Sequence, residues 1–239
     1  MANQNLFIPV TQDEKKDYQY EEAMKTLRTN IQFSGSGLKV IMLTSTMPDE
    51  GKSETSSQLA ISMAQTEGRV LFIDADIRKS VLVSRFGFGQ QIYGLTQYLT
   101  GQKLLGDILY HTNLPNLDII FSGPMAPNPA ELLGEDAFAR LVEWARNEYD
   151  TIIIDTPPLG SVIDAAIISQ RCDGAILVVE SGALSYRLVQ KAKNQLERTG
   201  CRILGAVLSR VDMAGSGYYH RYYGKYSKYS KYYENESDK

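Results

Sequence analysis

Six short aliphatic runs, separated by longer stretches of helical periodicity, constrain the fold of this chain more than any other feature. The runs are Val40–Leu43, Val70–Ile73, Leu117–Phe121, Thr151–Ile154, Ala175–Val179 and Ile203–Leu208. They carry β-branched residues on both parities, which is typical of strands buried on both faces of a parallel sheet. Between them, apolar residues recur at helical spacing, as in Phe138, Leu141, Val142 and Ala145, and again in Leu188, Ala192 and Leu196. The alternation predicts right-handed βαβ units in an α/β doubly wound, mainly parallel sheet.

Composition divides the 239 residues into three zones. Residues 1–37 are polar, with one helical pattern and a Ser-Gly-Ser-Gly hinge, and residues 38–212 hold the alternating pattern. Residues 213–239 are rich in Tyr, Lys, Ser and Gly and almost free of aliphatic side chains, so they cannot form a core. We therefore predict an N-terminal segment with one helix, a single α/β domain and a flexible tyrosine-rich tail.

Charge and cysteine content argue against several protein classes. The formal net charge of −3 gives the whole chain no attraction to nucleic acid or to a membrane. No apolar run at the start could serve as a signal peptide, and none approaches the roughly 20 residues that a membrane span needs. Cys172 and Cys201 fit a reducing compartment, and His111 and His220 do not suggest a metal cluster. We expect a cytoplasmic protein that reaches a membrane only through a partner.

The strongest candidate site is the segment Thr-Met-Pro-Asp-Glu-Gly-Lys-Ser at residues 46–53, which follows the first strand and precedes a helix. In a P-loop, backbone N–H groups wrap phosphates and the helix N-terminus adds its dipole. Lys52 is expected to reach the β- and γ-phosphates and the Ser53 hydroxyl to bind Mg²⁺. Thr46 stands where the motif has its first glycine, so a capped strand-to-helix loop is the alternative. The nucleotide-binding residues predicted on this reasoning are Pro48, Asp49, Glu50, Gly51, Lys52, Ser53 and Glu54, with Arg210 after the last strand beside the adenine.

Carboxylates follow two further strands of the predicted sheet. Asp74 and Asp76 end the run at 70–73, with Arg78 close behind, and Asp155 ends the run at 151–154. A single acid at a strand end is more often a cap than a ligand. Parallel strands, however, bring their carboxyl ends to one edge of the sheet, where the phosphate loop must also lie. Acids that converge there can hold Mg²⁺ directly or through water, so the three segments together predict a site for ATP and Mg²⁺.

At this point the chain resembles the bacterial tyrosine kinases, in particular the cytoplasmic kinases of Gram-positive capsule and exopolysaccharide systems. The resemblance rests on Glu-Ala-Met-Lys-Thr-Leu-Arg from residue 22, Pro-Asp-Glu-Gly-Lys-Ser from 48, Asp-Ala-Asp-Ile-Arg from 74, Asn-Pro-Ala-Glu-Leu-Leu from 128, Asp-Thr-Pro-Pro from 155 and the tyrosine-rich tail. It implies an ATP-dependent protein-tyrosine kinase that regulates polysaccharide synthesis and export.

The resemblance also implies roles for individual residues. Lys52 and Ser53 match the Walker A lysine and hydroxyl, Asp74 and Asp76 an additional Walker A′ pair, and Asp155 the Walker B acid. We expect Asp74 to accept the tyrosine proton while Ser53, Asp76 and Asp155 hold the metal. Arg78 is either a charge-stabilising residue or a solvated surface arginine.

Two departures from the family pattern stand beside the lysine. Asp49 replaces the usual glycine and Glu54 a frequent threonine. Asp tolerates left-handed backbone better than most residues, so the turn can survive. Two added negative charges near ATP phosphates put the level of activity, more than its type, in question.

The tail holds eight tyrosines in a basic setting, with a period of three that fits neither helix nor strand. A solubilising tail and an arm that stacks on single-stranded nucleic acid are the alternatives. The kinase interpretation explains the tail better, as a flexible tethered substrate, and predicts no nucleic-acid partner. The predicted phospho-acceptors are Tyr218, Tyr219, Tyr222, Tyr223, Tyr226, Tyr229, Tyr232 and Tyr233.

Glu22, Lys25 and Arg28 lie three residues apart on the N-terminal helix. Intrahelical ion pairs, worth a few tenths of a kcal/mol, are the plain explanation. The resemblance implies instead a Glu-x-x-Arg-x-x-Arg motif for ring-like self-association, in which Lys25 lacks the bidentate fork of the first arginine. It further implies a membrane-embedded activator that recruits the protein to the inner face of the cell membrane, and a cognate phosphotyrosine phosphatase.

Two other functions remain open at this stage. A partitioning or septum-positioning ATPase of the deviant Walker class shares the predicted fold, but its signature lysine is Met47 here. An inactive nucleotide-binding adaptor that displays phosphotyrosine sites is favoured by Asp49 and Glu54.

Overall fold

The computed structural model describes residues 7–8, 18–66, 68–85 and 92–211. The chain divides into a compact unit, Met1–Ser209, and a second unit, Arg210–Lys239, each considered by itself. The tail tyrosines lie outside the described residues. Within those residues, no helix combines the length and the apolar character that crossing a bilayer requires.

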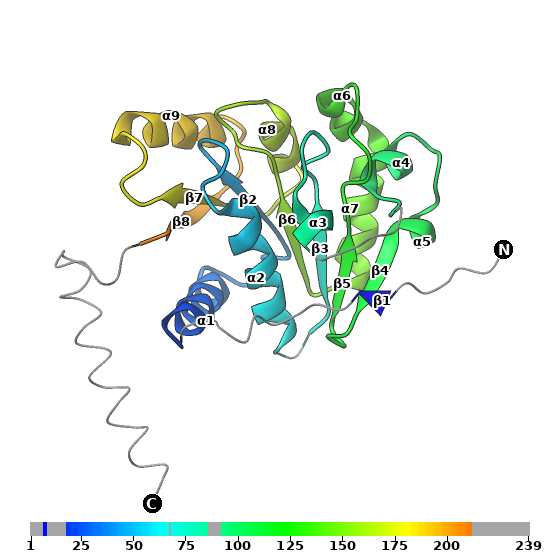
Figure 1. Cartoon of the computed structure of the whole chain (residues 1–239), viewed down its shortest axis with the longest axis horizontal. Helices are drawn as coiled ribbons and strands as arrows, with labels where there is room; N and C mark the ends of the chain where they lie inside the picture. Colours follow the sequence, from blue (N-terminus) through cyan, green and yellow to red (C-terminus); the bar gives the residue numbers. More distant parts are fainter. Residues whose placement is uncertain (1–6, 9–17, 67, 86–91, 212–239) are drawn as a thin grey trace, which may run out of the picture. The chain divides into compact units, whose positions relative to one another are not determined.

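The described residues of the first unit form an eight-stranded sheet in the order β1-β4-β5-β3-β6-β2-β7-β8, which crosses Figure 1 from right to left. The strands are β1 (Phe7–Ile8), β2 (Val40–Ser45), β3 (Val70–Asp74), β4 (Leu109–Thr112), β5 (Leu117–Ile120), β6 (Thr151–Asp155), β7 (Gly174–Glu180) and β8 (Ile203–Ser209). Every pairing is parallel except β4 with β5. The predicted doubly wound parallel sheet is confirmed, and the six aliphatic runs are its strands β2, β3, β5, β6, β7 and β8.

Helices cover both faces of this sheet, so the hydrophobic core consists of two clusters, one on each face. The helices are α1 (Tyr18–Phe33), α2 (Lys52–Ala64), α3 (Leu82–Arg85), α4 (Leu95–Leu99), α5 (Leu105–Ile108), α6 (Pro129–Gly134), α7 (Asp136–Glu148), α8 (Asp164–Ser169) and α9 (Tyr186–Glu197). One cluster joins α1, α2 and α3 to strand residues such as Ile41, Leu43 and Phe72. The other joins α4 to α9 to the alternate residues, including Val40, Met42 and Leu71. Strands buried on both faces are the reason for the unbroken aliphatic runs.

Two strands were not predicted, and one strand is less buried than expected. β1 and β4 extend the sheet beyond β5, where β4 runs antiparallel and lacks an aliphatic run. β8 is the opposite edge, and its residues are half-buried or exposed along its length. An edge strand has a neighbour on one side only, so its aliphatic residues do not indicate burial on both faces.

The register of the central strands positions the site. Asp74 at the end of β3 pairs with Asp155 at the end of β6, and Asp155 pairs with Leu43 of β2. The loop that follows β2 and the acids that follow β3 and β6 therefore share the carboxyl edge of the sheet, where doubly wound proteins bind ligands.

Candidate active site

The loop between β2 and α2 has the compact form of a phosphate-binding loop. The Ser45 hydroxyl donates to the Met47 carbonyl at 2.8 Å, and Gly160 N–H donates to the Thr46 carbonyl at 3.0 Å. Gly51 has a φ of 80° immediately before Lys52 starts α2. Asp49 has a φ of 67°, so it adopts the left-handed conformation that glycine favours. The loop thus keeps its turn without the expected glycines at positions 46 and 49.

Glu50 supports the loop from inside the protein. Its side chain is buried, and its carboxylate accepts Met47 N–H at 2.6 Å and Glu180 N–H, at the end of β7, at 3.2 Å. The hydroxyl of Ser209, the last residue of β8, donates to the Glu50 carbonyl at 2.6 Å. The carboxylate of this predicted nucleotide-binding residue therefore faces the protein and ties the loop to the ends of β7 and β8.

Lys52 and Asp155 form the centre of the site. Lys52 Nζ lies 2.8 Å from Asp155 Oδ1 and 3.0 Å from Ser53 Oγ, and the side chains of Lys52 and Asp155 are 7% and 1% exposed. Ser56, one helical turn after Lys52, also donates to Asp155 Oδ1 at 2.8 Å. Ser56 lies four residues after Lys52 and therefore on the same face of α2, so this spacing could have predicted that Ser56 belongs to the site.

Asp155 Oδ2 is buried and accepts no hydrogen bond in the described structure, and the Thr46 hydroxyl at the start of the loop is in the same state. A buried polar atom without a partner costs about 1–3 kcal/mol unless a ligand or water completes it. The unsatisfied oxygen of Asp155, together with the Ser53 hydroxyl that contacts the same Lys52 ammonium group as Asp155, fits a Mg²⁺ site. The described residues contain no cluster of three or more His, Cys, Asp or Glu side chains able to hold a metal unaided. In nucleotide sites, phosphates and waters supply most of the Mg²⁺ ligands.

Asp74 is fully buried beside this pair. Burial, with the nearby Asp155 charge, raises the pKa of Asp74 to about 7, although Ser80 and Lys52 act in the opposite direction. Its Oδ1 accepts Asp76 N–H at 3.2 Å and its Oδ2 accepts the Ser80 hydroxyl. A carboxyl group poised near neutral pH suits proton transfer.

Asp76 and Arg78 lie in the loop after β3. Asp76 Oδ1 accepts the N–H groups of Lys79 at 3.0 Å and Arg78 at 3.3 Å. The Arg78 guanidinium forms a bidentate pair with Asp164, at 2.7 and 2.9 Å. Asp164 begins α8 with no exposed surface, so this ion pair fastens the β3 loop to α8. Arg78 is therefore not a freely solvated arginine. Sequence reasoning missed Asp164, whose signal was an acid inside an apolar segment, where a charge needs a partner.

The remaining predicted residues occupy varied positions. Pro48 and Asp49 are exposed, and Glu54 lies partly buried in the first turn of α2. Arg210 follows β8 with a φ of 51°. On α1, Lys25 pairs with Glu22 at 2.7 Å, while Arg28 donates to the Ser62 carbonyl of α2 at 2.6 Å. Arg28 thus helps to dock α1 on α2 within the same chain.

Comparison with known proteins places these features in a family. The family model described as an AAA domain matches residues 38–200. Tyrosine-protein kinase CpsD of Streptococcus agalactiae is 46% identical over 204 residues, which span 84% of this chain and 89% of that protein. The kinase domain of the Escherichia coli tyrosine kinase ETK aligns with a TM-score of 0.80 at 35% identity, covering 86% of this chain and 81% of that structure. The septum site-determining protein MinD of Pyrococcus horikoshii, solved with Mg-ADP, aligns with a TM-score of 0.61 at 23% identity over 73% of this chain and 72% of that structure, and its likeness concerns the fold alone.

Proposed function

The chain belongs to the bacterial tyrosine-protein kinases, and on this basis we propose that it transfers the γ-phosphoryl group of ATP to tyrosines of its own C-terminal segment. Protein-tyrosine kinase activity is the family's activity, whereas the septum-site protein shares only the fold. The observation that carries the proposal is the meeting of Lys52, Ser53, Asp74 and Asp155 at one edge of the sheet, with one Asp155 oxygen left unsatisfied.

The loop residues 48–54 bind the nucleotide phosphates in this proposal, mainly through backbone N–H groups and the N-terminus of α2. Lys52 neutralises charge on the β- and γ-phosphates. Two of its three N–H bonds are directed to Ser53 and Asp155, so it is held at the point where the phosphates arrive.

Ser53, Asp76 and Asp155 would hold Mg²⁺, directly or through water. When bound, Mg²⁺ supplies positive charge that stabilises the transferring phosphoryl group. Asp155 contributes the buried oxygen that lacks a protein partner. Ser56 keeps the other Asp155 oxygen in a fixed orientation by its hydrogen bond.

Asp74 serves as the proton acceptor for the attacking tyrosine. The phenolic oxygen forms a bond to the γ-phosphorus as the bond to the β–γ bridging oxygen breaks, which releases ADP, and the phenolic proton passes to Asp74. Positioning and charge neutralisation supply most of the catalysis in phosphoryl transfer. The acceptors are the tail tyrosines between Tyr218 and Tyr233.

Three partners complete the proposal. Self-association through Glu22, Lys25 and Arg28, in a ring-like form, would present the tail of one subunit to the active site of the next. A membrane-embedded activator would recruit the kinase to the inner face of the cell membrane, and a phosphotyrosine phosphatase would reverse its action. The likeness to CpsD supports a role in capsular or exopolysaccharide synthesis and export.

Mass spectrometry of phosphosites tests the proposal on the purified full chain incubated with MgATP. We expect phosphate on tail tyrosines and its loss in Lys52→Met. Lys193→Met, on the exposed side of α9, is the matched control and should retain it. ATP hydrolysis without phosphotyrosine would identify a regulatory ATPase instead. Nucleotide binding without either activity would identify an inactive adaptor.

A further inference from the structure

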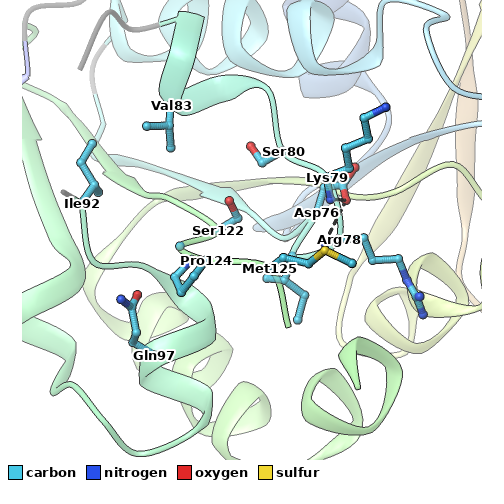
Figure 2. A pocket seen from close by; sticks show the side chains of 12 residues that line it. Asp76, Arg78, Lys79, Ser80, Val83, Ile92, Gln97, Ser122, Pro124 and Met125 are labelled. Carbon is cyan, nitrogen blue, oxygen red and sulfur yellow. Dashed lines mark hydrogen bonds between the residues drawn. The ribbon is translucent and has the colours of Figure 1, made fainter. Parts of the chain in front are cut away.

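A groove of about 780 Å³ lies between α8 and α9, which Figure 1 shows next to each other. It is separate from the cavity of Figure 2, which Asp76, Ser80 and Ser122 help to line and which borders the active site described above. The buried residues of α8 and α9 belong to one core cluster, and those of α2 belong to the cluster on the other face of the sheet. The groove therefore lies away from the helix that begins at the phosphate site, and its volume is within the roughly 300–1,000 Å³ common for ligand sites.

The α9 wall of this groove is basic. Arg187, Lys191 and Arg198 line it, and all three residues are exposed. Their spacings of four and seven residues place them on one face of the helix. Among the described residues, no acidic side chain lines the groove, and none of the three cations forms an ion pair. The groove thus presents positive charge that the protein does not neutralise, which favours an anionic ligand.

The α8 wall supplies apolar surface. Ile163 is 53% exposed, and Ile167, one helical turn later, is half-buried. On the opposite wall, the Tyr186 hydroxyl donates to Gln190 at 2.9 Å, and the Gln190 amide donates to Asn194 at 2.8 Å. These hydrogen bonds hold a row of polar side chains along the groove. A ligand that matches both walls combines an apolar body with a strongly anionic end.

We propose that the groove binds the tyrosine-rich segment of a second copy of this chain after the tyrosines of that segment have been phosphorylated. The aryl ring of a phosphotyrosine packs against Ile163 and Ile167, and its phosphate accepts hydrogen bonds from the cations of α9. Arginine clusters recognise phosphorylated motifs in this way. The inference rests on the proposed function, because kinase activity supplies the phosphotyrosine, and it adds a site that binds the product.

Charge makes this recognition depend on phosphorylation. Residues 225–233 contain three lysines and no acidic residue, so the basic groove repels the unmodified segment. Each phosphotyrosine adds about −1.5 to −2 at pH 7, so three of them change the net charge of the segment from positive to negative. The same groove therefore excludes the substrate form of the segment and attracts its product form.

The spacing of the tyrosines matches that of the cations. Tyr226, Tyr229 and Tyr232 recur at every third residue. A segment bound in the polyproline II conformation, with three residues per turn, aligns such residues on one face about 9 Å apart. Lys191 and Arg198 are seven residues apart, which is about 10–11 Å along an α-helix. Consecutive phosphates of one bound segment can therefore reach both cations.

Binding of a synthetic peptide tests the groove without any kinase activity. A fluorescent peptide of residues 225–233, with phosphotyrosine at positions 226, 229 and 232, is titrated with the dephosphorylated full chain in the absence of ATP. We expect saturable binding that weakens with added salt. Binding should be at least about tenfold weaker for the unphosphorylated peptide and for a peptide with phosphoserine at the same three positions. Equal affinity for the phosphoserine peptide, or no saturable binding of the phosphotyrosine peptide, would overturn the proposal.

Charge substitutions on α9 locate the binding site. Lys191→Gln and Arg198→Gln should each weaken binding of the phosphotyrosine peptide about fivefold or more, because each removes a charged hydrogen-bond donor. Lys193→Gln removes the same charge from the same helix outside the groove lining, so it is the matched control and should have little effect. An equal loss in the control would indicate general attraction between charges and contradict the assignment.

An apolar substitution tests the α8 wall, and a separate assay tests the kinase. Ile163→Ser should reduce the preference for phosphotyrosine over phosphoserine, whereas Leu188→Ser, 42% exposed and outside the lining, should not. An unchanged preference in Ile163→Ser would contradict the placement of the ring. Phosphotyrosine formation is measured independently on the wild-type chain with MgATP. Peptide binding without phosphotyrosine formation would retain the groove and reject the kinase proposal, and phosphotyrosine formation without peptide binding would do the reverse.

Discussion

Asp49 lies at the turn of the phosphate loop. Its charge lowers nucleotide affinity, and its left-handed backbone conformation lowers the free energy of unfolding; the two effects can be measured separately. Its side chain is exposed and its φ is 67°, in the region where a side chain is strained. We expect Asp49→Asn to raise nucleotide affinity several-fold at low salt, because it removes a charge that repels phosphates. Asp49→Gly should give the same gain and also raise the free energy of unfolding by up to about 1 kcal/mol.

Titration with a fluorescent ADP analogue at two salt concentrations measures the effect of Asp49. Asp136→Asn, which neutralises an exposed acid in the first turn of α7, is the control for a general change in charge. Equal affinity of wild type and both Asp49 variants at low salt would mean that the Asp49 charge does not reach the phosphates.

Asp74 makes stability depend on pH in a direction opposite to that of most carboxylates. Its pKa is about 7 in the folded chain, well above the 3.8 of an ordinary aspartate, so between these two pH values the native state binds more protons than the unfolded state. Unfolding free energy should therefore be highest near pH 4 and fall as the pH rises to about 7, by roughly 2–4 kcal/mol from this group alone.

Denaturant unfolding without nucleotide, at intervals from pH 4.5 to 8, measures that slope. Asp74→Asn cannot titrate, so the difference between wild type and variant isolates the contribution of this residue. The free energy of unfolding of Asp74→Asn should increase relative to that of the wild type as the pH rises. A constant difference across the range would show that Asp74 is ionised throughout.

At the scale of elements, the sequence predicted the six strands that carry aliphatic runs and missed β1 and β4, which carry none. The run Ile152–Ile154 of β6 indicates a strand because both faces of that strand pack against helices, which requires consecutive aliphatic side chains. β4 alternates between buried and exposed residues over four positions, and β1 has two residues, too few for a periodic signal. Strands as short as these are specified by their neighbours in the sheet more than by their own composition.

Some features of the candidate site could likewise be predicted from the sequence, whereas others could not. The meeting of the acids could be predicted, because carboxyl ends of parallel strands share one edge. The bidentate pair of Arg78 and Asp164 joins residues 86 positions apart, so no local spacing announces it. The inward orientation of Glu50 depends on Glu180 N–H and likewise appears only in the folded chain.

The turn after β6 holds the phosphate loop through a close backbone contact. Gly160 N–H donates to the Thr46 carbonyl, and a Cβ on Gly160 would lie 2.2 Å from that oxygen. Gly160→Ala must therefore displace the loop. We expect at least about tenfold weaker nucleotide binding and a loss of roughly 1–3 kcal/mol in unfolding free energy.

Gly134→Ala supplies the matched control for that substitution. A Cβ at Gly134 would meet only Ile167 Cγ2, at 4.0 Å, in ordinary contact. Nucleotide titration and thermal unfolding on both variants compare the two glycines. Wild-type affinity in Gly160→Ala would mean that the phosphate loop accommodates the shift without cost.

At the scale of the whole molecule, self-association depends on how much of the α1 motif remains available to a second subunit. Lys25 and Glu22 are about half-exposed, while Arg28 is engaged with Ser62 in its own chain. An ammonium offers a point charge, whereas a guanidinium offers a planar fork that binds a carboxylate through two hydrogen bonds. Lys25→Arg should therefore strengthen the proposed oligomer several-fold.

Sedimentation velocity over a range of protein concentrations, with nucleotide present, measures this effect. Lys193→Arg is the matched control, because Lys193 forms a comparable exposed helical ion pair with Glu197 on α9. A shift to larger species in Lys25→Arg alone supports association through α1. A monomer at every concentration in both variants would reject self-association by this surface, and equal shifts would attribute the change to arginine in general. If the oligomer presents tails to neighbouring active sites, phosphotyrosine per subunit should rise with protein concentration, and more steeply in Lys25→Arg than in the control.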